Sequence, residues 1–209
     1  MLKTTTRRSF TFSRTQPNRR ALTLIEILIT VAILGILAAA VIPQFGATAP
    51  DQVRGAAQIV AADMDYARSL AISNNSTYLI SFSKTRNRYI LTHSGTNTSL
   101  DDLPDNPFRR PSDDSKSLIV QLSDFPHVGS DVTIAAIVTD EPSPQEVTSI
   151  EFDTLGQTTR TQPTLIWLSS SAGAEDVYLP IEINPVTGLT SIGEITTVAP
   201  SVSSEIPST

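Results

Sequence analysis

The sequence predicts an α+β fold, in which a long N-terminal α-helix, half membrane-embedded and half amphipathic, packs on an antiparallel β domain. Three observations predict it. An apolar run extends from Leu22 to Ile42, and apolar residues at helical spacing follow between Asp51 and Ser73. After Asn75 the pattern changes to short strand-like runs separated by turn residues. One helix laid on such strands makes a single small core.

The apolar run from Leu22 to Ile42 has 21 residues. At about 1.5 Å per residue, a helix of this length covers about 31 Å, close to the roughly 30 Å hydrocarbon core of a bilayer. The basic residues before it are Lys3, Arg7, Arg8, Arg14, Arg19 and Arg20, and no acid precedes it. Because a basic flank stays in the cytoplasm, we predict a single-pass segment with a cytoplasmic N-terminus and an extracytoplasmic C-terminal domain.

Glu26 is the only charged residue within this run. An ionised carboxylate in hydrocarbon costs at least a few kcal/mol and indicates a functional role with a partner. A cleaved secretory signal peptide is disfavoured, because its apolar region usually has only about 7 to 15 residues. An uncleaved signal anchor leaves Glu26 unexplained. A cut between Ala21 and Leu22, in contrast, creates an α-amino group with a reference pKa of about 7.7 to 8.0, and this cation would suit Glu26.

The segment from Ala21 to Pro43 resembles the type III signal of type IV pilins and type II secretion pseudopilins. Ala21 stands where that family usually has Gly, Leu22 stands where it usually has Phe or Met, and the leader of 21 residues is longer than is common among pseudopilins. The resemblance implies that a prepilin peptidase cuts after Ala21 and that Leu22 is then N-methylated. It also implies that Glu26 pairs with the N-terminus of a neighbouring subunit during assembly.

The second half of the predicted helix is amphipathic. Pro43 removes the hydrogen bond to the Ala39 carbonyl, so we expect a kink where the helix leaves the bilayer. The apolar stripe that follows contains Val53, Ala57, Val60, Met64, Ala67 and Ala71. Residues 44–75 are therefore expected to continue the membrane helix of residues 22–43 as one bent spine that stops at Asn74-Asn75.

Residues 76–198 are expected to form the β domain. The strand-like runs are Thr77–Ser83, Arg88–His93, Leu118–Ser123, Val132–Thr139, Val147–Asp153, Leu165–Ser169, Val177–Ile183 and Leu189–Ile195. Turn signals lie at Asp153–Gly156 and Asn184–Gly188. The tail of residues 199–209 is rich in Ser and Pro and is predicted to be disordered.

Three further segments resemble landmarks of the GspH/FimT family of minor pilins and pseudopilins. They are Met64–Ile72, Ile150–Gly156 and Pro185–Leu189, in that order along the chain. The resemblance implies that Arg68 lies on the helix and that Gly156 lies in a β-turn. Neither residue is assigned a catalytic role.

The composition disfavours several classes of function. The chain has 15 Lys and Arg against 21 Asp and Glu, and without the six basic residues of the leader 9 remain against 21, a net charge of −12. Such a domain should repel nucleic acid, so no nucleic-acid partner is expected. The chain has no Cys, and its two histidines, His93 and His127, lie far apart in the sequence without a Gly-x-Ser-x-Gly motif. We therefore expect no enzyme.

No cofactor or metal site is predicted either. The region from Ser94 to Lys116 is rich in Asp, but it lacks EF-hand spacing and contains Arg109-Arg110, so it is interpreted as a solvated loop. The single tryptophan, Trp167, is flanked by apolar residues and is expected in the core.

The sequence therefore predicts a structural subunit of the bacterial inner membrane. Its expected parts are a cleaved leader (1–21), a transmembrane helix (22–43), an amphipathic continuation (44–75), the β domain (76–198) and a tail (199–209). The predicted partners are a prepilin peptidase and other pilin or pseudopilin subunits, in a type II secretion pseudopilus or a type IV pilus. The alternative is an uncleaved single-pass anchor that carries an extracytoplasmic binding domain. The sequence leaves open whether the machine serves secretion, a pilus or DNA uptake.

Overall fold

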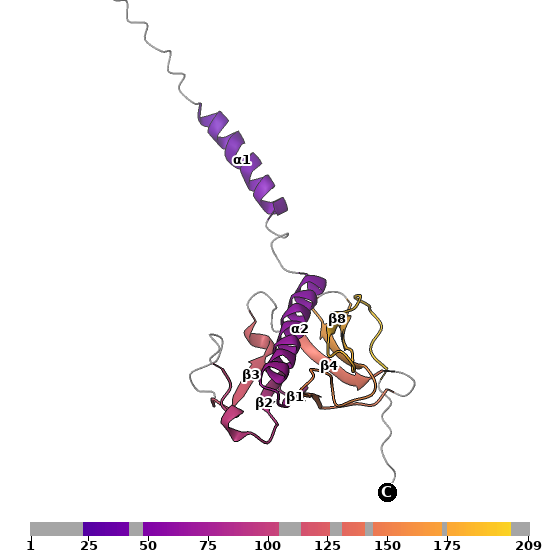
Figure 1. Cartoon of the computed structure of the whole chain (residues 1–209). Helices are drawn as coiled ribbons and strands as arrows, with labels where there is room; N and C mark the ends of the chain where they lie inside the picture. The colour runs from indigo at the N-terminus through magenta and orange to yellow at the C-terminus, as the bar shows by residue number, and fades with distance from the viewer. Residues whose placement is uncertain are drawn as a thin grey trace, which may run out of the picture. The chain divides into compact units, whose positions relative to one another are not determined.

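The computed structural model describes residues 23–41, 48–104, 114–125, 131–140, 144–172 and 175–201 (Figure 1). The chain divides into two compact units, Met1–Gly46 and Ala47–Thr209, which are described separately. Several predicted features lie outside the described residues: the leader 1–21, the cleavage site at Ala21 and Leu22, Pro43, and residues 202–209 of the tail. The predictions made for them stay predictions.

The first unit contains helix α1, Leu24–Val41. Its apolar side chains are exposed over the part of the helix whose burial is described, from Leu24 (82% exposed) to Leu37 (56% exposed). Across the part of the chain that the structure describes, no helix combines the length and apolar character that crossing a membrane requires. The transmembrane interpretation of residues 22–43 stays a prediction. The expected unbroken continuation over residues 44–75 differs from the structure at Thr48, which has an extended backbone (ψ 159°), so the next helix begins only at Ala49.

The second unit begins with helix α2, Ala49–Ser73. Pro50 fits the first turn of the helix, because a backbone N–H at this position has no partner within the helix and its loss costs no hydrogen bond. The hydroxyl of Thr48, which precedes the helix, donates to the Asp51 carboxylate (2.6 Å). The helix stops at Asn74-Asn75 as predicted, with Asn75 in the left-handed region (φ 48°). The buried side chains of α2 are Ala49, Val53, Ala56, Ala57, Val60, Met64, Ala67, Leu70 and Ala71. This face confirms the predicted amphipathic pattern.

Two antiparallel four-stranded sheets follow in the described part of this unit. The first has the order β3-β2-β1-β5, with β1 Tyr78–Ser83, β2 Arg88–His93, β3 Ser117–Gln121 and β5 Ser149–Phe152. The second has the order β4-β6-β7-β8, with β4 Val132–Thr139, β6 Thr164–Ser170, β7 Val177–Ile183 and β8 Thr190–Ile192. Short 3-10 turns occupy Thr98–Leu100 and Leu122–Asp124. The predicted strands are found, but several of them are shorter than predicted. Strand β3 ends at Gln121 because Leu122 begins the second of these turns, and β8 covers only Thr190–Ile192 of the predicted Leu189–Ile195.

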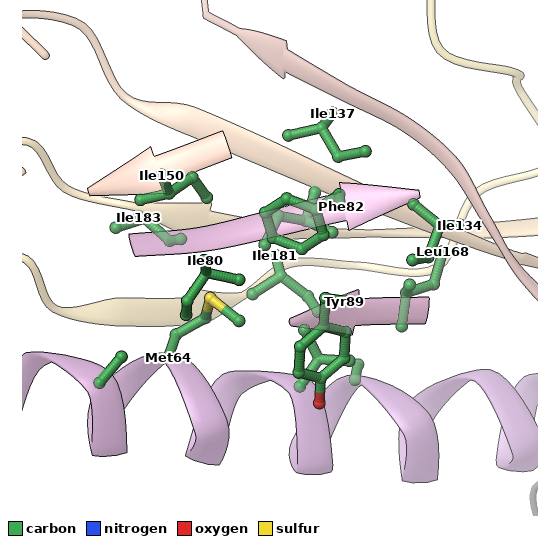
Figure 2. Close-up of a cluster of buried hydrophobic side chains, with 14 of the residues drawn as sticks. Met64, Ile80, Phe82, Tyr89, Ile134, Ile137, Ile150, Leu168, Ile181 and Ile183 are labelled. Atoms are coloured by element: carbon green, nitrogen blue, oxygen red, sulfur yellow. The ribbon is translucent and has the colours of Figure 1, made fainter. Parts of the chain in front are cut away.

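Helix α2 packs against strands of both sheets, and the core lies between them. In Figure 2, Met64 of α2 points toward the cluster that contains Ile80 of β1, Ile150 of β5 and Ile181 of β7. All four side chains are fully buried. The structure therefore confirms the predicted fold class, a helix packed on antiparallel sheets.

The position of Trp167 differs from the prediction. Strand side chains alternate between faces, and in β6 the neighbours Ile166 and Leu168 are buried on the core side. Trp167 therefore lies on the opposite face, where it is half-buried opposite Pro180 of β7. The apolar neighbours of Trp167 suggested a core position. Because successive side chains of a strand point to opposite faces, the burial of these neighbours instead puts Trp167 on the face away from the core.

Candidate functional site

Glu26 lies in the first turn of α1. Its backbone N–H donates to the Thr23 hydroxyl (3.3 Å), and Thr23 immediately precedes the helix. A Thr followed three residues later by Glu is the spacing of a capping box, and this bond is one of its two hydrogen bonds. A carboxylate in the first turn is also stabilised by the positive end of the helix dipole. Sequence reasoning missed Thr23, although the Thr-x-x-Glu spacing was a usable signal.

Within the described side chains of α1, Glu26 is the only ionisable one. The other polar side chain of this helix, Thr30, donates its hydroxyl to the Ile27 carbonyl of the preceding turn (2.9 Å). Thr30 is thus satisfied within its own helix. Ala21 and Leu22 lie outside the described residues, and the pairing of Glu26 with a terminal amine stays a prediction.

The three segments that resemble family landmarks meet at one junction. Arg68 of α2 donates from Nε to the Thr187 carbonyl (2.7 Å), and Gly156 and Gly188 both have positive φ (79° and 63°). A Cβ on Gly188 would lie 1.8 Å from the Gly156 carbonyl oxygen, and one on Gly156 would lie 2.6 Å from the Ile72 side chain. The positions implied for Arg68 and Gly156 are confirmed. Only glycine allows the two turns to pack this closely on each other and on α2.

A hydrogen-bonded chain of Ser76, His93 and Asp101 lies beside the end of α2. The Ser76 hydroxyl is 2.7 Å from Nε2 of His93, and Nδ1 of His93 is 2.9 Å from the Asp101 carboxylate. The hydrogen bond from His93, and secondarily the charge of Lys116 3.7 Å away, hold the pKa of Asp101 below its usual value. Pairing of β1 with β2 sets Tyr78 opposite His93 and so brings His93 to Ser76.

This order of groups is that of a serine hydrolase triad, but the serine is covered. A Cβ on Gly95 would lie only 2.1 Å from the Ser76 hydroxyl oxygen, so the main chain of the loop lies directly over it. The His93 side chain is fully buried. The arrangement fastens the loop after β2 to the end of α2. Sequence reasoning treated His93 as an isolated histidine, because its partners are brought to it only by strand register and by the following loop.

A second buried polar pair joins α2 to the first sheet. The Tyr89 hydroxyl donates to the Asp63 carboxylate. Burial raises the pKa of Asp63, and the hydrogen bond from Tyr89 partly opposes that rise. The pKa of Tyr89 lies well above its usual value because of burial and then because of the Asp63 charge. The pair positions a strand on the helix with a charge that is costly to bury.

In the described ranges, no group of three or more His, Asp or Glu side chains lies close enough together to hold a metal ion. Residues 105–113 of the Asp-rich region and His127 lie outside those ranges. The expectation of no metal and no cofactor therefore stays an expectation.

Comparison with known proteins bears on the N-terminal segment. Residues 16–42 match the family model of the prokaryotic N-terminal methylation motif. The matched range includes Ala21, Leu22 and Glu26. The match confirms the predicted N-terminal methylation signal.

Solved structures with similarity to this chain include a minor pseudopilin and a type IV minor pilin. The minor pseudopilin EpsH of the type 2 secretion system of Vibrio cholerae aligns with a TM-score of 0.47 and 11% identity, over 68% of this chain and 96% of EpsH. The type IV minor pilin FimU of Pseudomonas aeruginosa aligns in one crystal form with a TM-score of 0.43 and 13% identity, over 69% of this chain and 90% of FimU. No curated protein sequence matches the chain.

Proposed function

We propose that this chain is a structural subunit, a minor pilin or pseudopilin, of a type II secretion pseudopilus or a type IV pilus. The match of residues 16–42 to the methylation motif is the observation that carries the proposal. The fold supports it, since the second unit is a closed α+β domain that an N-terminal helix could present outside a membrane. The proposed role is structural rather than catalytic.

Processing comes first in the proposed sequence of events. A prepilin peptidase cuts between Ala21 and Leu22, and Leu22 becomes the methylated N-terminus. Before the cut, the chain lies in the bacterial inner membrane with its N-terminus in the cytoplasm, because the six basic residues of the leader stay on that side. The apolar character of α1 on all its sides supports a membrane position for this helix.

Glu26 then directs assembly by pairing with the N-terminal amine of a neighbouring subunit. In an apolar medium the attraction between the two charges is strong, but so is the cost of removing both from water. The clearest use of such a pair is therefore to fix the axial register of one helix against the next. Contacts of this head-to-tail kind do not close, so they generate a helical filament.

The test separates processing from assembly. Glu26→Ala should leave membrane insertion and cleavage intact, because neither the basic leader nor the cleavage site changes, yet it should abolish incorporation into filaments. Intact mass spectrometry of the membrane form measures cleavage, and subunit content of sheared filaments measures incorporation. Thr30→Ala is the matched control, since Thr30 is the other polar residue of α1 and bonds only within its helix. Normal incorporation of the Glu26→Ala protein would contradict the pairing.

The alternative function is an uncleaved membrane anchor for a binding domain. The same mass measurement distinguishes the two proposals, because the anchor retains Met1 whereas the processed subunit begins at Leu22. If the chain keeps residues 1–21 in cells that assemble such filaments, the subunit proposal is refuted.

A further inference from the structure

The turn between β1 and β2 is basic in an otherwise acidic domain. Lys84, Arg86 and Arg88 lie within five residues, and they are three of the nine basic residues that follow the leader. We call residues 83–88 the basic hairpin. Lys84 and Arg86 are exposed, and Arg88 is half-buried.

The basic hairpin is held in one conformation. Asn87 has a positive φ (49°), and its side chain makes two hydrogen bonds to the main chain of β4 in the other sheet. Its Nδ2 donates to the Val132 carbonyl (2.7 Å), and its Oδ1 accepts from the N–H of Ile134 (2.9 Å). The Asn87 carbonyl also accepts from the N–H of Leu122 (3.1 Å). A surface that is already ordered loses less entropy when it binds a partner.

The positive charge of the hairpin is only partly neutralised. Lys84 forms an ion pair with Glu146. Within the described part of the chain, Arg86 and Arg88 have no ion pair, and Nε of Arg88 is buried without a hydrogen-bond partner. The hairpin therefore offers net positive charge at a fixed place.

A cavity of about 250 Å³ opens beside the hairpin. Phe82, Ile137 and Val147 supply its apolar lining, and Lys84 and Glu146 lie among its polar lining residues. Pockets for drug-sized ligands usually have volumes of about 300 to 1,000 Å³. A cavity of this smaller size suits one inserted side chain.

We propose that the basic hairpin and this cavity bind the acidic surface of a second copy of this chain. A second copy fits by charge, since after the leader it carries 21 acidic residues against 9 basic ones. Carboxylates of the second copy face Arg86 and Arg88, and one apolar side chain enters the cavity. The contact is heterologous, so it repeats along a row of subunits. This inference rests on the proposed function, but it places a contact in the β domain and not in the N-terminal helix.

Crosslinking of purified full-length protein in detergent tests the contact. After the leader the chain has only two lysines, Lys84 and Lys116, so a zero-length amine-to-carboxylate crosslinker reports on few sites. An equal mixture of unlabelled and ¹⁵N-labelled protein identifies links between copies as peptides of mixed label. Lys84 should form such mixed-label links in addition to a link with its ion-pair partner Glu146 in its own copy, whereas Lys116 should link only within its own copy to Asp101, which lies 3.7 Å away.

Charge reversal makes the test specific. Arg86→Glu should lower the Lys84 links between copies by about tenfold, because the attraction becomes a repulsion. Raising the salt to 1 M should have a similar effect, since the Debye length falls from about 8 Å to about 3 Å. Arg54→Glu is the matched control, because Arg54 is an exposed arginine of α2 outside the hairpin, and it should leave the links unchanged.

Three results bear on the proposal in distinct ways. An intact Lys116–Asp101 link in the Arg86→Glu protein shows that the domain has kept its fold. The proposed contact is overturned if the unaltered protein forms no Lys84 links between copies. It is also overturned if these links persist in the Arg86→Glu protein. Lys84 links that persist in the Glu26→Ala protein, which fails to enter filaments, support a β-domain contact that is independent of the N-terminal helix. A failure of the proposed function instead appears as a retained leader, with the Lys84 links unaffected.

Discussion

Helix α1 and the unit Ala47–Thr209 use apolar residues in opposite ways. The large apolar side chains of α1 are exposed from Leu24 to Leu37, with a single carboxylate in the first turn of the helix. In α2 and the strands, the fully buried apolar side chains lie on one face of each element and together form a core. The difference indicates that the domain satisfies its own hydrophobic surface, whereas α1 depends on a lipid or protein environment. Changes in the two regions should therefore have effects of different kinds.

The largest expected effect comes from the core. Met64→Ala removes a fully buried side chain and should lower the free energy of unfolding by about 2 to 5 kcal/mol, through lost contacts and a residual cavity. The fluorescence of Trp167, the only tryptophan, reports denaturant unfolding of this unit. Leu34→Ala in α1, where the side chain is 63% exposed, should leave the same transition unchanged. A shift caused by Leu34→Ala would remove the proposed distinction between the regions.

Glycines sharpen the comparison further. Gly188→Ala would place a Cβ 1.8 Å from the Gly156 carbonyl oxygen at a positive φ, so it should cost about 2 to 3 kcal/mol of stability. Gly35→Ala in α1 meets nothing within 4 Å, and alanine favours helix by about 1 kcal/mol. It should therefore leave domain unfolding unaltered. Equal unfolding midpoints for the two variants would show that the two turns relax without cost.

How much could be predicted from the sequence follows the same division. The period of α2 and the alternation of β1 are local patterns, so their buried faces were predictable from spacing alone. The pairing of Ser76 with His93 and Asp101 depends on strand register and on a loop that returns over the serine. No local pattern encodes that meeting. The methylation signal was predictable because its residues are contiguous in the sequence, and the match of residues 16–42 to the family model confirms it.

A smaller effect should come from the loop after β2, which the hydrogen bonds among Ser76, His93 and Asp101 hold to the end of α2. Ser76→Ala leaves Nε2 of buried His93 without its partner and should cost about 1 to 2 kcal/mol. Ser99→Ala, at an exposed position of the same loop, should change stability by less than about 0.5 kcal/mol. Denaturant midpoints from Trp167 fluorescence measure both. A Ser76→Ala protein as stable as the unaltered one would show that the bond contributes nothing.

The smallest expected effect depends on pH, because the pKa of Asp63 is raised in the folded domain and the pKa of Asp101 is lowered. Burial raises the pKa of Asp63 above its unfolded value, so its contribution to stability falls as pH rises from about 3.8 through the folded pKa. Asp63→Asn keeps an acceptor for Tyr89 without the charge, and should stabilise the protein by up to about 1 kcal/mol at pH 7 and by less near pH 3.5. Asp101→Asn should behave in the opposite way, because the hydrogen bond from His93 lowers the pKa of Asp101.

For Asp101 the stabilisation is present above the unfolded pKa and is lost as pH falls through the folded one. Asp101→Asn should therefore destabilise the protein at pH 7, and the difference should close toward acid. Denaturant midpoints measured from pH 3 to pH 7 give both trends in one experiment. Parallel trends in the two variants would contradict the assignment of burial as the dominant cause at Asp63 and of hydrogen bonding at Asp101. Opposed trends would show that the folded domain stabilises the ionised carboxylate of Asp101 and destabilises that of Asp63.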